Sequence, residues 1–91
     1  MAVRVRVPGP LRRLVGGEPE VTVDGDTVAA ALGDLETRYP GFHDRLYDAD
    51  GQLRQFINIY VNDSDIRFSQ GLETPVGERD EVSIVPAVAG G

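Results

Sequence analysis

The final residue of the sequence, Gly91, carries the most distinctive chemical group in the chain, an α-carboxylate on a residue without a side chain. The segment leading to it reads Pro86-Ala87-Val88-Ala89-Gly90-Gly91. Glycines are costly to order, but they can thread a channel too narrow for a Cβ atom. A carboxylate is inert to nucleophiles until an adenylating enzyme joins it to AMP, after which sulfur can attack and leave a thiocarboxylate. A frayed end of small residues is the alternative explanation.

The charged residues narrow the possible partners. The net charge of −6 argues against a nucleic-acid partner, because phosphates would be repelled. All nine basic residues are arginines. The absence of lysine excludes a phosphate-loop lysine, a Schiff-base lysine and a side-chain amine that could accept an isopeptide bond. The acidic surface predicts a basic protein partner.

Length and composition predict one folded domain, residues 1–86, followed by a flexible C-terminal tail, residues 87–91. The apolar share of 41% is ordinary for a globular chain, which argues against disorder. The absence of cysteine excludes a disulfide framework, a thiolate zinc site and a nucleophilic thiol, and it predicts a cytoplasmic protein. The alternating residues after Met1 predict neither a signal peptide nor a membrane span.

The body of the domain offers little other chemistry. His43 is the only histidine, so with no cysteine and no second histidine we expect a surface or half-buried side chain rather than a catalytic or metal-binding one. Asp63-Ser64-Asp65 resembles the start of a calcium loop, but Phe68 and Thr74 stand where that loop needs glycine and glutamate. The sequence therefore predicts no metal site and no enzyme active site.

The first part of the chain predicts a pair of strands. Valines alternate with arginines over residues 3–7, which is typical of a half-buried strand. We expect a loop over residues 11–17 and a second strand over residues 20–24, because Val21 and Val23 share one face.

A helix is predicted next, with Thr27 as its N-cap and Pro40 at its end. Its apolar residues fall on one stripe at helical spacing. They are Val28, Ala31, Leu32, Leu35 and Tyr39.

The second part of the chain predicts further strands. A short helical turn is expected within residues 42–50, and the strongest strand signal covers residues 53–62. A short edge strand at 66–68, an irregular connection at 71–79 and a final strand at 81–85 complete the pattern.

This order predicts an α+β protein with a β-grasp, ubiquitin-like fold. We expect a mixed sheet of four to five strands with one main helix packed across it, and the first and last strands adjacent at its centre. The predicted core residues share the periodicity of these elements. They are Val5, Val7, Val23, Val28, Leu32, Leu35, Ile57, Ile59, Val61, Val82 and Ile84.

Several motifs together resemble the ubiquitin-like sulfur carriers, which include the small subunit of molybdopterin synthase, the thiamin-pathway carrier and the cysteine-pathway carrier. The resemblance covers nearly the whole chain and is strongest to the actinobacterial-type cysteine-biosynthesis carrier. Ala87 stands where molybdopterin-type carriers usually have a second proline. The motifs are Gly25-Asp26-Thr27, Asp34-Leu35-Glu36, Arg45-Leu46, residues 56–63, Asp65, Arg67-Phe68, Gly71-Leu72 and the end, 80–91.

The resemblance implies a cycle in which this chain is a co-substrate and not a catalyst. A ubiquitin-activating-type enzyme would adenylate Gly91 with ATP, and a sulfur donor would make the thiocarboxylate. A pyridoxal-phosphate cysteine synthase would then use that sulfur, and a zinc metallopeptidase would release cysteine. None of these cofactors would be bound by this chain. The alternatives are a molybdopterin carrier that serves the synthase large subunit, a ubiquitin-like protein modifier, and an adaptor with an inert tail.

A partner must also dock on the body near the tail. Ile66, Phe68 and Leu72 are apolar, lie close to turns and fall outside the core periodicity, so we expect them to be exposed and to bind partners. The alternative is that these three side chains close one end of the core.

Overall fold

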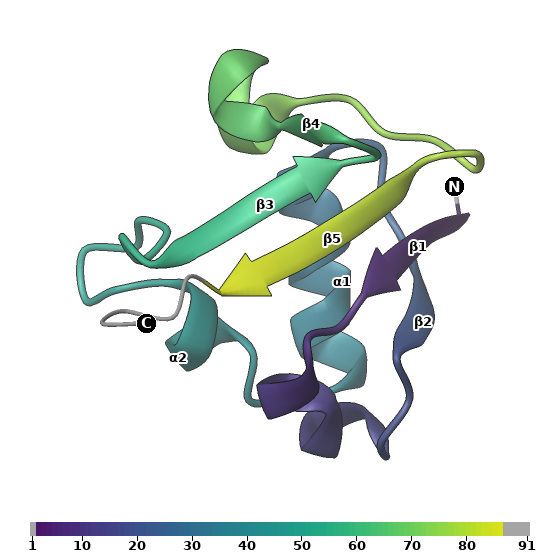
Figure 1. Cartoon of the computed structure of the whole chain (residues 1–91), viewed down its shortest axis with the longest axis vertical. Helices are drawn as coiled ribbons and strands as arrows, with labels where there is room; N and C mark the ends of the chain where they lie inside the picture. The colour runs from purple at the N-terminus through teal and green to yellow at the C-terminus, as the bar shows by residue number, and fades with distance from the viewer. Residues whose placement is uncertain (1, 87–91) are drawn as a thin grey trace.

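The computed structural model describes residues 2–86 of the chain, so the predicted tail, residues 87–91, lies outside the described residues. Five strands form one mixed sheet in the order β2-β1-β5-β3-β4, and helix α1 packs across it (Figure 1). The elements are β1 (Ala2–Arg6), the 3-10 helix η1 (Gly9–Val15), β2 (Glu20–Asp24), α1 (Val28–Arg38), α2 (His43–Leu46), β3 (Ile57–Val61), β4 (Ser64–Asp65), the 3-10 helices η2 (Ile66–Phe68) and η3 (Gly71–Glu73), and β5 (Glu81–Pro86).

The last strand, β5, lies at the centre of the sheet. It runs parallel to β1, with Val82 opposite Val5, and antiparallel to β3, with Ile84 opposite Ile59. A hairpin joins β1 to β2 at one side, and the chain returns to the other side of β5 through α1. This arrangement confirms the predicted β-grasp fold and the predicted central pairing of the first and last strands.

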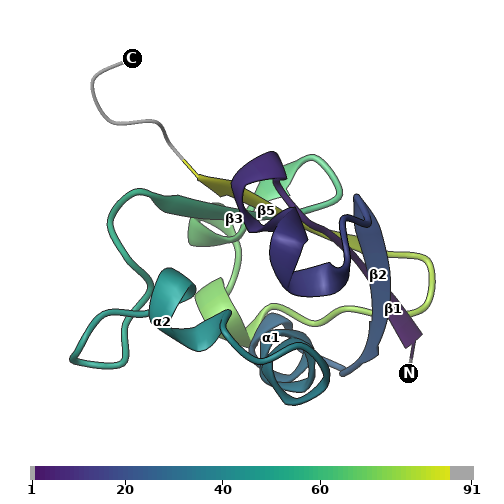
Figure 2. The same ribbon diagram turned by 90° about the horizontal axis from the view of Figure 1, so that it is seen from below.

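The strands follow the alternation of the sequence. In β1 the valines are buried and the arginines are exposed, and β2 repeats this pattern with Val21 and Val23 inside. Figure 2 shows α1 on one side of the sheet, beneath the strands in that view. One face of the sheet therefore packs against the helix, and the other presents polar side chains from the central strands.

Helix α1 begins and ends where the sequence predicts. The backbone N–H of Ala30 donates to the Thr27 hydroxyl at 3.1 Å, which satisfies one of the free amides of the first turn. A Cβ atom added to Gly25 would lie 2.5 Å from the Ala31 nitrogen. Only glycine therefore allows the turn after β2 to pass this close to the helix. Tyr39 ends the helix immediately before Pro40.

A polar contact closes the outer edge of β2. The backbone N–H of Asp24 donates to Oδ2 of Asp34 in α1 at 2.8 Å, and Arg38 binds both carboxylates, at 2.6 Å to Asp34 and 2.8 Å to Asp24. The amide of Asp24, followed by the Arg38 side chain, lowers the pKa of Asp34 below its ordinary value. An edge strand with free amides invites pairing with another chain, and this contact removes one of them.

The loop predicted over residues 11–17 is wrong, because the chain forms the 3-10 helix η1 there. Leu11 and Val15 are buried in the core, and Gly16 ends the helix in the left-handed region. Pro10 lies in the first turn of η1, where its missing amide hydrogen costs no helical hydrogen bond.

The edge strand predicted at 66–68 is also wrong, since those residues form η2 and the short strand β4 lies just before them. The Asp65 carboxylate accepts the backbone N–H of Arg67 at 2.8 Å and caps this 3-10 helix. The strand predicted over 53–62 is shorter, because β3 starts at Ile57. The connection at 71–79 contains η3.

The predicted core is largely confirmed. Nine of its eleven residues are buried, and Ile57 and Val61 are partly buried against the core. Both lie at the ends of β3, whereas α1 packs mainly against β2 and η3. The prediction omitted several buried residues, of which Phe42 is the largest. The others are Val3, Leu11, Val15, Val21, Ala31, Leu46, Ile66 and Val76.

Truncation of Leu32, which is 2% exposed, tests the core. Leu32→Ala should lower the free energy of unfolding by about 2–5 kcal/mol, because it removes buried methyl groups and leaves a cavity. Phe68→Ala is the matched surface control and should change stability by less than about 0.5 kcal/mol. Urea denaturation of both variants measures this, and a loss for Leu32→Ala no larger than the control would place Leu32 outside the core.

Candidate functional site

The base of the predicted reactive tail is Pro86, the last residue of β5. Its partner across the sheet is Ile57 of β3, so β5 remains paired up to its end. The remaining tail residues, Ala87, Val88, Ala89, Gly90 and Gly91, lie outside the described residues. The structure therefore defines the point from which the tail starts and the surfaces around it.

The number of residues between Pro86 and Gly91 limits how far Gly91 can lie from the body. Five residues separate Pro86 from the end of the sequence, and a fully extended chain of that length spans at most about 17–18 Å. A partner that acts on Gly91 must therefore contact or closely approach the surface around Pro86.

Two grooves meet at Pro86. The first, here the sheet groove, has a volume of about 460 Å³, and the second, here the α2 groove, has a volume of about 320 Å³. The sheet groove is lined by Arg6, Val7, Pro8, Arg12, Tyr60, Asn62, Asp63, Ser83, Ile84, Val85 and Pro86. The α2 groove is lined by Arg45, Asp48, Arg54, Gln55, Phe56, Ile57 and Pro86.

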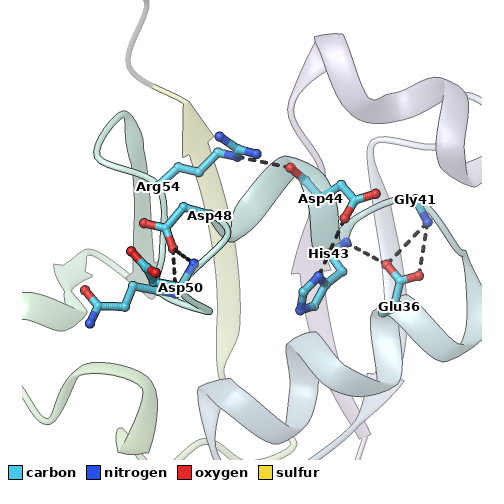
Figure 3. A network of polar contacts seen from close by, with 8 residues as sticks. Glu36, Gly41, His43, Asp44, Asp48, Asp50 and Arg54 are labelled. Carbon is cyan, nitrogen blue, oxygen red and sulfur yellow. Dashed lines mark hydrogen bonds and ion pairs between the residues drawn. The ribbon is translucent and has the colours of Figure 1, made fainter.

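The short helix α2 is held in place by Glu36 of α1 (Figure 3). The Glu36 carboxylate accepts the backbone N–H of His43 at 2.6 Å and that of Gly41 at 3.2 Å. The His43 amide is the main cause of a lowered pKa at Glu36, which favours the ionised acceptor. A Glu36 that stays charged thereby ties the start of α2 to the main helix.

Two further contacts shape the wall of the α2 groove (Figure 3). Nε of Arg54 donates to the backbone carbonyl of Asp44 at 3.0 Å, which joins the loop before β3 to α2. The Asp48 carboxylate accepts the backbone N–H groups of Asp50 and Gln52, at 2.9 and 3.1 Å. These bonds fold the loop back and place Arg54 beside the base of the tail.

The three predicted partner-binding residues have different environments. Phe68 is 89% exposed, as expected, and Leu72 is partly buried. The exposure predicted for Ile66 is wrong, because this side chain is 2% exposed and belongs to the core. The cap at Asp65 turns the chain into η2 and directs Ile66 inward, which leaves Phe68 outside.

Ile66 and Leu72 line a third groove, of about 430 Å³, together with Leu53, Ile57 and Arg54. Pro86 is not among the residues of this groove. None of the three apolar residues selected from the sequence therefore lines the two grooves that meet at Pro86.

An ion pair between Asp65 and Arg67 lies at η2, the 3-10 helix that carries Phe68. The Asp65 carboxylate is 8% exposed and accepts Nη2 of Arg67 at 2.7 Å, in addition to the backbone bond that caps η2. Arg67 also donates to the Asn58 side chain of β3 at 2.9 Å. The Arg67 side chain is the main cause of a lowered pKa at Asp65.

His43 lies on the surface, where its ring is 4.9 Å from that of Tyr47. Within residues 2–86 no group of three His, Cys, Asp or Glu side chains could hold a metal ion. Over the same residues, no helix is long and apolar enough to cross a membrane.

Sequence reasoning missed the residues around Pro86. Phe56 is 54% exposed in the α2 groove, with Arg45 and Arg54 beside it. Arg45 lies in α2, whereas Arg54 and Phe56 lie in the loop before β3. Their spacing in the sequence therefore gives no sign that they lie together. The only local signal is the large apolar side chain of Phe56 two residues after Arg54.

Comparison with known proteins identifies the family. The sequence model of the ThiS family matches residues 5–91.

The chain belongs to the ThiS family.

Relatives within and around the family support this assignment. The chain is 50% identical to the sulfur carrier protein CysO of Mycobacterium tuberculosis over 93 aligned residues, which cover all of both chains. It is 33% identical over full length to small archaeal modifier protein 3 of Haloferax volcanii. In the crystal structure of the Amycolatopsis orientalis BexX/CysO complex, the matching chain has a TM-score of 0.89 and 47% identity, covering 98% of this chain and 99% of that one.

These comparisons confirm the resemblance to the ubiquitin-like sulfur carriers and the β-grasp fold. As a member of the ThiS family, the protein is a carrier rather than a catalyst.

The Asp65–Arg67 pair predicts a pH-dependent contribution to stability. Because the folded pKa of Asp65 lies below its ordinary value of 3.8, the contribution is complete above that pH and is lost as the pH falls through the folded pKa. Asp65→Asn keeps a capping oxygen but removes the charge. At pH 7 it should lower the free energy of unfolding by up to about 1 kcal/mol, since Arg67 is largely exposed.

Urea denaturation at pH 7, 5 and 3 measures this difference, which should shrink at pH 3. Asp63→Asn removes a carboxylate from the adjoining turn without touching Arg67 and is the control. Equal effects of the two substitutions at every pH would contradict a specific role for Asp65.

Proposed function

We propose that the protein carries sulfur as a thiocarboxylate on Gly91 and donates it for cysteine biosynthesis. The observation that supports this most strongly is the combination of a Gly-Gly end, five residues beyond a central strand, with full-length similarity to proteins named sulfur carrier CysO. Similarity of this extent includes the segment that the chemistry needs as well as the fold that presents it.

The proposed chemistry takes place on one carboxylate. An oxygen of the Gly91 carboxylate attacks the α-phosphorus of ATP in an adenylating partner, and pyrophosphate leaves. A sulfur donor then displaces AMP from the acyl-adenylate and leaves the thiocarboxylate. In a pyridoxal-phosphate cysteine synthase, the thiocarboxylate sulfur replaces the leaving group on the β-carbon of an activated serine, which joins the new cysteine to Gly91 as a thioester that rearranges to an amide. A zinc metallopeptidase hydrolyses that amide, which releases cysteine and restores the Gly91 carboxylate. ATP, pyridoxal phosphate and zinc are thus bound by the partners.

In this reaction the chain positions the reactive carboxylate and allows it to fit into the active site of a partner. β1 pairs with β5 over residues 81–83, and β3 pairs with it over residues 82–86, so the start of the tail has a defined position relative to the docking surfaces. The last two residues have no side chain to collide with the walls of a closed active site. The carboxylate is therefore delivered at a set distance from a rigid body, which lowers the entropic cost of reaction.

Protein modification is the second candidate function, because a relative at 33% identity is named small archaeal modifier protein 3. The same activated carboxylate would then be transferred to lysine side chains of target proteins. This chain contains no lysine, so it offers no side-chain amine for attachment to another copy of itself.

Changes to the length of the tail test the carrier function. A chain without Gly91 still ends in a glycine carboxylate, but its reach is shorter by about 3.3–3.6 Å. A chain extended by one alanine converts the Gly91 carboxylate into an amide. Both variants should fold normally, and both should lose thiocarboxylate formation by about a hundredfold or more, because misplacing the reacting carbonyl by about 1 Å has that effect.

Intact-protein mass spectrometry after incubation with ATP, the adenylating enzyme and a sulfur source measures oxygen-to-sulfur exchange. Circular dichroism controls for folding. Sulfur gained by either variant at the wild-type rate, or never gained by the wild type, would contradict the carrier function. Conjugates on lysine in place of the thiocarboxylate would favour the modifier, and transfer of sulfur to a molybdopterin precursor would favour that pathway.

Phe68 is the second residue to test, as a proposed anchor for a partner. Phe68→Ala should weaken binding of the adenylating enzyme or the cysteine synthase by about tenfold or more, as expected for an exposed aromatic anchor. Ser69→Ala, a change at the neighbouring exposed position, is the control. Isothermal titration calorimetry with each enzyme gives the affinities, and unchanged affinity for both would exclude Phe68 as an anchor.

A further inference from the structure

The charge around Pro86 is opposite to that of the chain as a whole. The chain has nine arginines and fifteen acidic residues. The two grooves that meet at Pro86 are instead lined by four arginines and two aspartates. We call these four residues, Arg6, Arg12, Arg45 and Arg54, the arginine collar. The remaining five arginines share the rest of the molecule with thirteen carboxylates.

Most of the collar is not neutralised by neighbouring acids. Within residues 2–86, Arg12, Arg45 and Arg54 make no ion pair, and Arg6 approaches Glu81 only to 3.7 Å. Arg12 and Arg54 each donate Nε to a backbone carbonyl, which fixes the side chain without cancelling its charge. Outside the collar, Arg38 and Arg67 bind carboxylates at 2.6–2.8 Å, whereas Arg13 and Arg79 also make no ion pair within the described residues.

An apolar side chain lies inside this basic surface. Phe56 is 54% exposed and lines the α2 groove together with Pro86, Arg45 and Arg54. Aromatic residues and arginines are enriched in the centres of protein interfaces, where the ring fills a pocket and the guanidinium groups bind carboxylates. The groove at the base of the tail thus combines an exposed aromatic side chain with two arginines.

We propose that the arginine collar docks on an acidic rim around the channel of the adenylating partner, with Phe56 seated in an apolar pocket of that rim. This proposal rests on the proposed function, because the partner is the enzyme that receives the tail. The chain has a positive end at Pro86 and a negative remainder. The electric field of an acidic rim on the partner therefore attracts the basic end of the carrier, with its tail, toward the channel. The same field repels the acidic faces of the carrier. The short reach beyond Pro86 brings the collar to the rim when the tail is inserted.

Charge reversal in the collar tests this docking. Arg45→Glu is the primary variant, since its side chain makes no hydrogen bond or ion pair within the described residues. Arg79→Glu is the matched control, because it makes the same charge change just before β5, at the end of the strand opposite Pro86. Phe56→Ala tests the apolar contact. Thermal denaturation verifies that each variant is folded.

Two measurements with the adenylating enzyme of the same organism separate docking from chemistry. The first is the affinity of the carrier for the enzyme without ATP, at 0.05 M and 0.5 M NaCl. Arg45→Glu should weaken binding about tenfold at low salt, with most of the difference gone at high salt. Arg79→Glu should change the affinity less than twofold, and Phe56→Ala should weaken binding equally at both salt concentrations.

The second measurement is the KM for the carrier and the kcat of thiocarboxylate formation, of which only KM should rise for Arg45→Glu. Equal effects of Arg45→Glu and Arg79→Glu, or tighter binding after reversal, would overturn the acidic rim. A wild-type chain that binds in a collar-dependent manner but gains no sulfur would refute the proposed function and leave the docking intact. A wild-type chain that does not bind the enzyme would overturn both.

Discussion

The pairing of β5 with β1 on one side and β3 on the other is the constraint on which the rest of the structure depends. Val82 and Ile84 are buried because this strand is central, and they belong to the same core as the buried residues of α1. The same pairing carries the backbone, in register, to Pro86. Burial of one face of the strand and placement of the tail are therefore two results of a single set of hydrogen bonds.

The parts of the fold that follow from local periodicity could be predicted from the sequence. The alternation in β1 and β2 and the cap at Thr27 each depend on neighbouring residues alone, and the structure confirms them. The parts that depend on distant contacts could not. Ile66 appeared available for partners because its spacing matches no strand, yet the Asp65 cap turns it into the core.

The candidate site also has one part that is visible in the local sequence and one part that depends on contacts between distant residues. The Gly-Gly end is visible as a sequence motif, whereas the collar is assembled from β1, η1, α2 and the loop before β3, and no spacing relates them. The net charge of −6, from which a basic partner is predicted, is a sum over the whole chain. Charge acts locally, over about a Debye length of 8–10 Å, so that sum does not reveal the four arginines in the two grooves at Pro86.

The central position of β5 also has a consequence for how the molecule is made. Residues 81–86 leave the ribosome after every other strand, and without them β1 and β3 have no common neighbour. Such long-range pairing forms late, because the chain must close a large loop before any contact compensates for the lost entropy. A nascent or truncated chain without residues 81–86 therefore has no completed sheet.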